Sequence, residues 1–169
     1  MIAGLAAATR CARLTAGVLL FVGLNGCGLL IPQTTALRDV PPPDLLPRVE
    51  LVEVPFFPQE EYQCGPAALA TVLADQKRAV TPGDLVSQVY VPERKGSLQI
   101  EMLAAARRHG MVSYELAPSM EAMLRELAAG NPVIVLQDVG IWPFENWHYA
   151  VAVGYNLDSG DVVLRSGKV

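Results

Sequence analysis

Cysteine, histidine and positive charge are all scarce in this chain of 169 residues. Three cysteines are too few for a disulfide scaffold, and their spacing is not that of paired zinc ligands. The 13 Lys and Arg are outnumbered by 17 Asp and Glu, whereas domains that bind nucleic acid usually carry a basic excess. Charged residues make up only 18% of the chain and hydrophobic residues 51%, which excludes global disorder. We therefore expect one folded domain, no nucleic-acid partner, and neither a metal nor a cofactor.

The N-terminal segment has the pattern of an export signal. Arg10 and Arg13 are its only charged residues, and no acid appears before Asp39. An uncharged apolar run follows from Leu14 to Leu24. A basic region followed by about ten apolar residues and a small residue is typical of a secretory signal peptide.

Cys27 makes this signal more specific. Leu24, Gly26 and Cys27 resemble the end of a bacterial lipoprotein signal, in which the cysteine is diacylated and becomes the mature N-terminus, although Asn25 is unusual there. One alternative is an uncleaved anchor, because Leu14 to Ile31 is an uncharged run of 18 residues, at the lower limit for a membrane span. Another is a buried helix. The first two readings place the rest of the chain outside the bacterial cytoplasm, anchored to a membrane of the cell envelope.

Three segments follow from this interpretation: a signal peptide over 1–26, a tether over 27–49, and a domain over 50–169. The tether contains five prolines between residues 32 and 47, which favour an extended, semi-rigid spacer. Loss of residues 1–26 removes two arginines and no acid, which leaves 11 basic against 17 acidic residues. It also removes Cys11. With Cys27 lipidated, Cys64 is the one remaining thiol, and an unpaired cysteine in an oxidising compartment calls for a function.

Local patterns in the domain predict helices first and strands afterwards. An edge strand or extended arm is expected over 50–57. Helices are expected over 65–76, from Thr81 and Pro82 to 90, over 97–109 and over 119–130, and strands over 111–116, 133–137, 147–155 and 161–164. The last two strands flank a turn at 158–160 and should form a hairpin. The layout is that of an α+β domain with helices packed on a mainly antiparallel sheet. The sequence stops five residues after Leu164, so we expect a fragment or a minimal form of the fold.

Cys64 and His148 are the residues suited to chemistry. Cys64 stands at the start of a predicted helix, where free backbone N–H groups and the helix dipole stabilise a thiolate. Gly65 after it permits close approach of a substrate backbone. His148 begins a predicted strand whose next same-side residues are small. A buried structural cysteine and a hydrogen-bonded core histidine are the alternatives. The other histidine, His109, is expected to complement a helix C-terminus.

These residues carry a resemblance to a known family. The segments VPFFPQEEYQCGPAALATVLA (54–74) and NWHYAVAVGYN (146–156) resemble the two signature blocks of papain-like peptidases that process bacteriocins at double-glycine leaders. The resemblance covers roughly residues 50–166 and implies a papain-like fold. It implies that Cys64 is the nucleophile, that His148 is the general base and acid, and that Gln59 helps to form the oxyanion hole. The family's glutamine stands six residues before its cysteine, whereas Gln59 stands five before Cys64, so Gln63 is a weaker candidate.

The residue that should orient the histidine departs from the family pattern. The family uses an Asp or Asn on the next strand, and by position this falls on Ser166. Serine accepts a hydrogen bond but carries no compensating charge. Asp158 and Asp161 are nearby in sequence, but solvated turn residues are their ordinary interpretation.

Three functions remain open from the sequence. The first is a membrane-tethered cysteine peptidase that hydrolyses peptide or protein substrates. The second is a papain-like amidase or acyltransferase that acts on envelope substrates. The third is a catalytically degenerate domain that binds peptides in the envelope. Cutting bacteriocin leaders is not expected, because the chain has no transporter segments and carries an export signal.

Overall fold

The computed structural model describes residues 32–168, which separate after Val40 into two units. The described part of the first unit is helix α2 (Pro32–Asp39), with Pro32 in the first turn, where helices tolerate proline. A helix thus occupies part of the segment for which we predicted an extended spacer. The predicted signal peptide and Cys27 lie outside the described residues. Among those described, no helix has both the length and the apolar character needed to cross a membrane.

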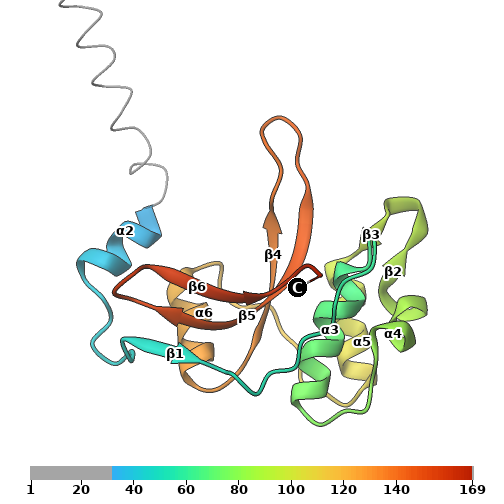
Figure 1. Cartoon of the computed structure of the whole chain (residues 1–169), viewed down its shortest axis with the longest axis horizontal. Helices are drawn as coiled ribbons and strands as arrows, with labels where there is room; N and C mark the ends of the chain where they lie inside the picture. The colour runs from blue at the N-terminus through green and yellow to red at the C-terminus, as the bar shows by residue number, and fades with distance from the viewer. Residues whose placement is uncertain (1–31, 169) are drawn as a thin grey trace, which may run out of the picture. The chain divides into compact units, whose positions relative to one another are not determined.

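The second unit is built around the long strand β5 (Trp147–Asn156), as Figure 1 shows. All of its partners in the sheet are antiparallel: β4 (Val133–Asp138) pairs with its first half, β1 (Arg48–Glu50) with its last three residues, and β6 (Asp161–Arg165) returns as a hairpin. A Cβ atom at Gly154 would lie 2.5 Å from the carbonyl oxygen of Val49, so glycine allows β1 to approach β5. The predicted hairpin and the strand over 133–137 are confirmed.

Four helices complete the second unit: α3 (Cys64–Asp75), α4 (Pro82–Val89), α5 (Gln99–Arg108) and α6 (Met120–Ala128). Helices α3 and α6 contact the sheet, and α4 and α5 pack on α3. Local signals fix the ends of these helices. The backbone N–H of Thr81 donates to the Asp84 carboxylate at 2.9 Å, which is half of a capping box. The Ser119 hydroxyl accepts from the backbone N–H of Ala122 at 3.1 Å. All four predicted helices are therefore present, with ends shifted by one or two residues.

The core joins the helices to β5. Leu69 and Leu73 of α3, Leu85 of α4 and Met102 of α5 are buried in one cluster with Tyr149, Val151 and Val153 of β5. Helix α6 contacts β5, β4 and β1, and its Leu124 and Leu127 are buried. Helices that precede a mainly antiparallel sheet give the predicted α+β class.

Two parts of the chain between α4 and α6 also differ from the prediction. A short hairpin of β2 (Tyr90–Val91) and β3 (Gly96–Ser97), joined by a 3₁₀ turn over Pro92–Arg94, lies between α4 and α5 where no strand was expected. Residues 111–116, predicted as a strand, have no strand partner. Instead, the Ser113 hydroxyl donates to the carbonyl of Leu103, and the Ser113 carbonyl accepts from the Arg107 guanidinium, so side-chain bonds to α5 hold this segment.

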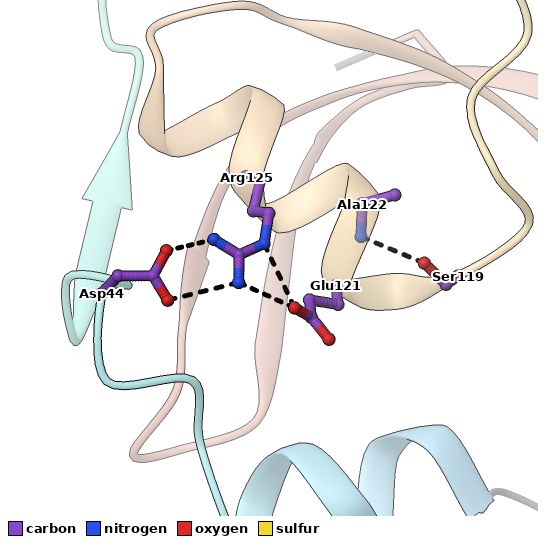
Figure 2. Close-up of polar contacts among 5 residues, drawn as sticks. All are labelled: Asp44, Ser119, Glu121, Ala122 and Arg125. Carbon is purple, nitrogen blue, oxygen red and sulfur yellow. Dashed lines mark hydrogen bonds and ion pairs between the residues drawn. The ribbon is translucent and has the colours of Figure 1, made fainter.

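A charged cluster fastens the chain before β1 to helix α6. Figure 2 shows Arg125 between Asp44 and Glu121, with both oxygens of the Asp44 carboxylate accepting from the guanidinium. Glu121, one turn earlier on α6, accepts from the same guanidinium at 2.8 Å. The pKa of Asp44 is lowered by the hydrogen bond from Arg125. These side chains are half exposed, so the cluster helps to fix the start of the domain rather than its core.

Candidate active site

Cys64 is the first residue of α3, and its thiol is half-buried and free. The first backbone bond of the helix runs from the N–H of Ala67 to the carbonyl of Gln63. The N–H groups of Cys64 and Gly65 therefore precede the hydrogen-bonded part of the helix, and Pro66 has no N–H to leave unpaired. The arrangement presents a thiol beside backbone donors at the positive end of a helix, which is a setting for a nucleophile.

Cys64, His148 and Gln59 line one cleft of about 910 Å³. They come from the N-terminus of α3, the second residue of β5 and the loop that precedes α3. The β2–β3 hairpin forms another part of the wall through Arg94, Lys95, Gly96 and Ser97. Segments far apart in the sequence thus meet at one end of β5.

His148 is held by Ser166. Its Nε2 atom lies 2.8 Å from the hydroxyl of Ser166, and Ser166 is the residue directly after the end of β6. Burial lowers the pKa of His148, so the fold favours the neutral imidazole, the form that accepts a proton. Ser166 is therefore the side chain that occupies the orienting position, although its contribution to catalysis stays a prediction.

Gln59 is buried and bonded at both ends of its amide. Its Nε2 donates to the backbone carbonyl of Tyr149 at 3.2 Å, and its Oε1 accepts from the N–H of Gly167 at 3.2 Å. Its own backbone N–H donates to the carbonyl of Gly167 at 2.9 Å. These bonds fix the amide nitrogen at the wall of the cleft. An amide nitrogen carries two hydrogens, so the bond to Tyr149 leaves one for another acceptor.

Asp158 and Asp161 lie too far from His148 to orient its ring. Asp161 pairs with Asn156 at the far end of the β5–β6 hairpin, eight residues along β5 from His148. That separation corresponds to about 27 Å of strand, far beyond the reach of a hydrogen bond. Asp158 lies in the turn beyond. The hairpin that brings Ser166 to the histidine carries both carboxylates away from it.

Gln63 and His109 lie outside the cleft wall. Gln63 precedes the first turn of α3, where its N–H donates to the carbonyl of Glu60 and its carbonyl accepts from Ala67. His109 follows the last residue of α5, as predicted, and its ring contacts the side-chain amide of Gln88 at 3.3 Å.

Ser97 is a cleft residue that the sequence did not reveal. A Cβ atom at Gly65 would lie 2.2 Å from the Ser97 hydroxyl oxygen and 2.5 Å from its Cβ. Gly65 is thus needed because Ser97 packs on the start of α3, whereas we had expected it to admit a substrate. The Ser97 hydroxyl is buried and finds no hydrogen-bond partner among the described residues. A two-residue strand gives no signal from which its position could have been predicted.

Tyr149, the neighbour of His148, connects the cleft to the core. Its ring is buried in the same cluster that Cys64 contacts, and its hydroxyl has no partner within the described part of the chain. Burial raises the pKa of Tyr149, with a smaller contribution from Cys64.

Charges of opposite sign border the cleft. Arg94 and Lys95 stand on the β2–β3 hairpin, and Glu60, Glu61 and Glu145 are also among the lining residues. Lys95 Nζ lies 5.4 Å from the centre of the Tyr62 ring, which is a cation–π contact. Both residues have positive φ, at 48° and 61°, a conformation that side chains other than glycine rarely adopt. Between residues 32 and 168 no group of His, Cys, Asp and Glu is arranged to hold a metal ion.

A scan of family models matches residues 51–166 to the Peptidase_C39 like family. No curated protein and no solved structure gives a significant match. The matched region runs from the loop after β1 to the serine beside His148, and it includes Cys64 and Gln59. Because the match extends over well more than half of the chain, this protein belongs to the Peptidase_C39 like family, whose members resemble papain-like cysteine peptidases.

Proposed function

We propose that this protein is a cysteine peptidase in which Cys64 and His148 perform the chemistry. The observation that carries the proposal is the shared cleft, in which a thiol at a helix N-terminus, an imidazole and a buried amide meet from three segments of the chain. The family indicates cysteine peptidase activity in general. The assignment of these residues to steps is our own inference.

In the first step, the Cys64 sulfur attacks the carbonyl carbon of a peptide bond. Its proton passes to His148, whose Nε2 is engaged by Ser166 and whose Nδ1 is then the atom that exchanges protons. The carbonyl oxygen becomes an oxyanion, and the remaining N–H of Gln59 Nε2 and the backbone N–H of Cys64 stabilise it. His148 then protonates the leaving amine, the C–N bond breaks, and a thioester to Cys64 remains.

In the second step, water attacks the thioester. His148 takes a proton from that water, and the same two donors stabilise the second oxyanion. Collapse of this intermediate breaks the C–S bond, returns the proton to the Cys64 sulfur and releases a carboxylic acid.

Hydrolysis of a broad fluorogenic peptide panel tests the assignment. We expect Cys64→Ala and His148→Ala to abolish turnover, and a peptide electrophile to label Cys64 in the wild type but only slowly in His148→Ala. His109→Ala is the matched control, because this histidine lies outside the cleft wall and should leave both readouts unchanged. Full turnover in Cys64→Ala would refute the assignment of Cys64 as the nucleophile.

One observation favours a second candidate, a peptide-binding domain without catalysis. Ser166 supplies no charge to balance an imidazolium, which weakens the thiolate–imidazolium pair. The rate of Cys64 alkylation against pH separates the two candidates. A rate that is already high at pH 6 supports catalysis, whereas a rate that rises only near an ordinary thiol value of about 8.5 supports the binding domain. Incubation of the protein with cell-envelope fragments, followed by mass spectrometry of the products, would identify an amidase or acyltransferase.

We also propose that the protein acts in the bacterial cell envelope, held to a membrane through lipid on Cys27. The support is the uncharged run that ends in Leu24-Asn25-Gly26-Cys27, after a segment whose only charges are two arginines. Mass spectrometry of the mature N-terminus should find a diacylated cysteine. Cys27→Ala should release the chain from the membrane fraction or leave it unprocessed.

A further inference from the structure

The loop between β4 and β5 displays an apolar tip to solvent. Ile141, Trp142 and Phe144 are 84%, 91% and 78% exposed, and Pro143 lies between the two aromatic residues. No charged residue occurs from Val139 to Phe144. In Figure 1 this hairpin extends beyond the rest of the sheet. Single exposed apolar residues are ordinary, but three large ones within four positions are not.

The tip is built to hold these side chains outward. The Asp138 carboxylate accepts from the backbone N–H of both Gly140 and Asn146, at 2.9 and 2.8 Å. The N–H of Phe144 donates to the carbonyl of Ile141 at 2.7 Å, which closes the turn. A Cβ atom at Gly140 would lie 2.0 Å from the Phe144 carbonyl oxygen, so only glycine fits there. The apolar residues are therefore presented by a fixed hairpin.

The stem of the same hairpin forms part of the cleft. Leu136 on β4 and Glu145, Asn146 and Trp147 on the returning side line it beside His148. Trp142 is six residues from His148, which corresponds to at most about 20 Å of extended chain. Whatever holds the tip therefore also positions the catalytic cleft.

The chemistry of the tip favours a lipid bilayer over a polypeptide. Trp is typical of the membrane interface, because its ring is apolar and its N–H is polar, and the Phe and Ile side chains add apolar area that can be buried among the lipid chains. The tip projects from the fold (Figure 1), and no residue from Val139 to Phe144 is among those that line the cleft. With helix α2 formed, the chain from Cys27 to Pro41 spans at most about 35 Å, so a lipid on Cys27 would keep the domain that carries the tip beside the same bilayer.

We propose that the segment from Ile141 to Phe144 inserts into the bilayer interface and holds the catalytic cleft at the membrane surface. This inference rests on the proposed membrane tether and is independent of the proposed chemistry. The contact is apolar, and the tip carries no cation to attract anionic headgroups. Raising the salt concentration should therefore leave it unchanged.

Trp142 is itself the reporter for the test, because the chain has only two tryptophans. The membrane-derived protein carrying Trp147→Phe is reconstituted into phosphatidylethanolamine–phosphatidylglycerol vesicles, with and without brominated acyl chains. We expect Trp142 emission to shift to shorter wavelength, to be quenched by the brominated lipid, and to lose its quenching by aqueous acrylamide. Adding Ile141→Ser and Phe144→Ser should reverse all three effects.

Val112→Ser in the same background is the matched control, because Val112 is equally exposed but lies outside the hairpin. It should leave Trp142 shielded. A chain that stays in solution beside the vesicles, or a bound chain whose Trp142 remains open to acrylamide, overturns the inference. If the tip variants instead reduce hydrolysis of a soluble peptide while Trp142 stays in water, the tip binds substrate and the bilayer proposal fails. Cleavage of that peptide and the mass of Cys27 report separately on the proposed chemistry and the tether.

Discussion

The pair of His148 and Ser166 decides how strong a base this cleft contains. A hydroxyl 2.8 Å from Nε2 fixes the direction of the ring, and it leaves a protonated ring without a balancing charge. Burial acts in the same direction, because it lowers the pKa of His148. The site therefore orients its histidine well and stabilises the imidazolium poorly.

Replacement of Ser166 should separate orientation from charge. Ser166→Ala removes one hydrogen bond of about 1 kcal/mol, which corresponds to a loss of about five-fold in kcat/KM. Ser166→Asp keeps an acceptor and adds a charge, so it should raise the pKa of His148 and increase kcat/KM above wild type. The pH dependence of kcat/KM on a soluble peptide measures both effects. Ser159→Ala, at the far turn of the hairpin, is the control, and unchanged kinetics in Ser166→Ala would contradict the orienting role.

The half-buried His148 also makes folding stability depend on pH. The pKa of His148 is lowered in the folded state from a value of about 6.5 in the unfolded chain. The unfolded state therefore takes up the proton at higher pH, and the free energy of unfolding should fall as the pH decreases from about 7 until the folded histidine is protonated as well.

Urea unfolding between pH 5 and 7.5 tests this dependence. His148→Gln should flatten the slope, while the two proteins should keep a constant difference above pH 7, where the histidine is neutral in both states. The pKa values of Asp44, Asp84 and Asp138 are lowered by hydrogen bonds, so the effect of these carboxylates on stability lies below about pH 5, outside this window. An equal slope in both proteins would show that His148 is not the group responsible.

The cleft residues differ in how far the sequence could predict them. Cys64 and His148 stand out because they are chemically distinctive and sit at predicted element starts. Ser166 could be placed only by comparison with the position of the Asp or Asn in the family that the sequence resembles. Ser97 could not be placed at all, since its role depends on a contact with Gly65 across a hairpin that has no sequence signal. The chemistry that a residue can perform follows from its type, whereas its contacts with distant segments can be known only from the folded structure.

The start of α3 depends on a contact with the β2–β3 hairpin. Gly65→Ala should destabilise the protein by roughly 1–3 kcal/mol, because its Cβ overlaps both side-chain atoms of Ser97. Ser97→Ala should not relieve this cost, since the Ser97 Cβ itself lies 2.5 Å from the new methyl group. Ser97→Gly should relieve most of it. Urea unfolding of the single and double variants measures the coupling, and additive effects would show that the two residues are independent.

Local signals predicted the helices well because each is encoded within its own segment. Pro82 and the bond between Thr81 and Asp84 define one start, and Gly110 and Gly130, with φ of 78° and 88°, define two ends. The strand predicted over 111–116 is wrong because alternation alone supplies no partner. Val112 and Tyr114 do face solvent, but no neighbouring strand offers a ladder. Hairpin β2–β3 was missed because its strands are two residues long and Lys95, rather than glycine, adopts the positive φ in its turn.

At the scale of the whole molecule, the acidic balance and the apolar hairpin tip set different limits on where the protein works. With 13 basic and 17 acidic residues, the chain gains no general attraction to an anionic surface. Any hold on the bilayer must come from the tether and from apolar contacts at the tip. Because the stem of the hairpin lines the cleft, such a hold would select substrates by location as well as by sequence.

A substrate held at the membrane should therefore be cut faster than the same peptide in solution. The test uses one cleavable peptide in two forms, free in solution and coupled to a lipid in the vesicles that carry the enzyme. We expect the initial rate to be roughly 10-fold or more higher on the lipid-coupled form, because its effective concentration is higher and the cleft is held at the surface. The variant with Ile141→Ser and Phe144→Ser should lose much of this advantage and keep its kcat/KM on the free peptide, because the tether remains while the cleft is no longer held at the surface. Val112→Ser should behave as wild type on both. Equal losses on the two substrates would mean that the tip acts on catalysis directly, and an unchanged ratio would mean that the tether alone positions the cleft.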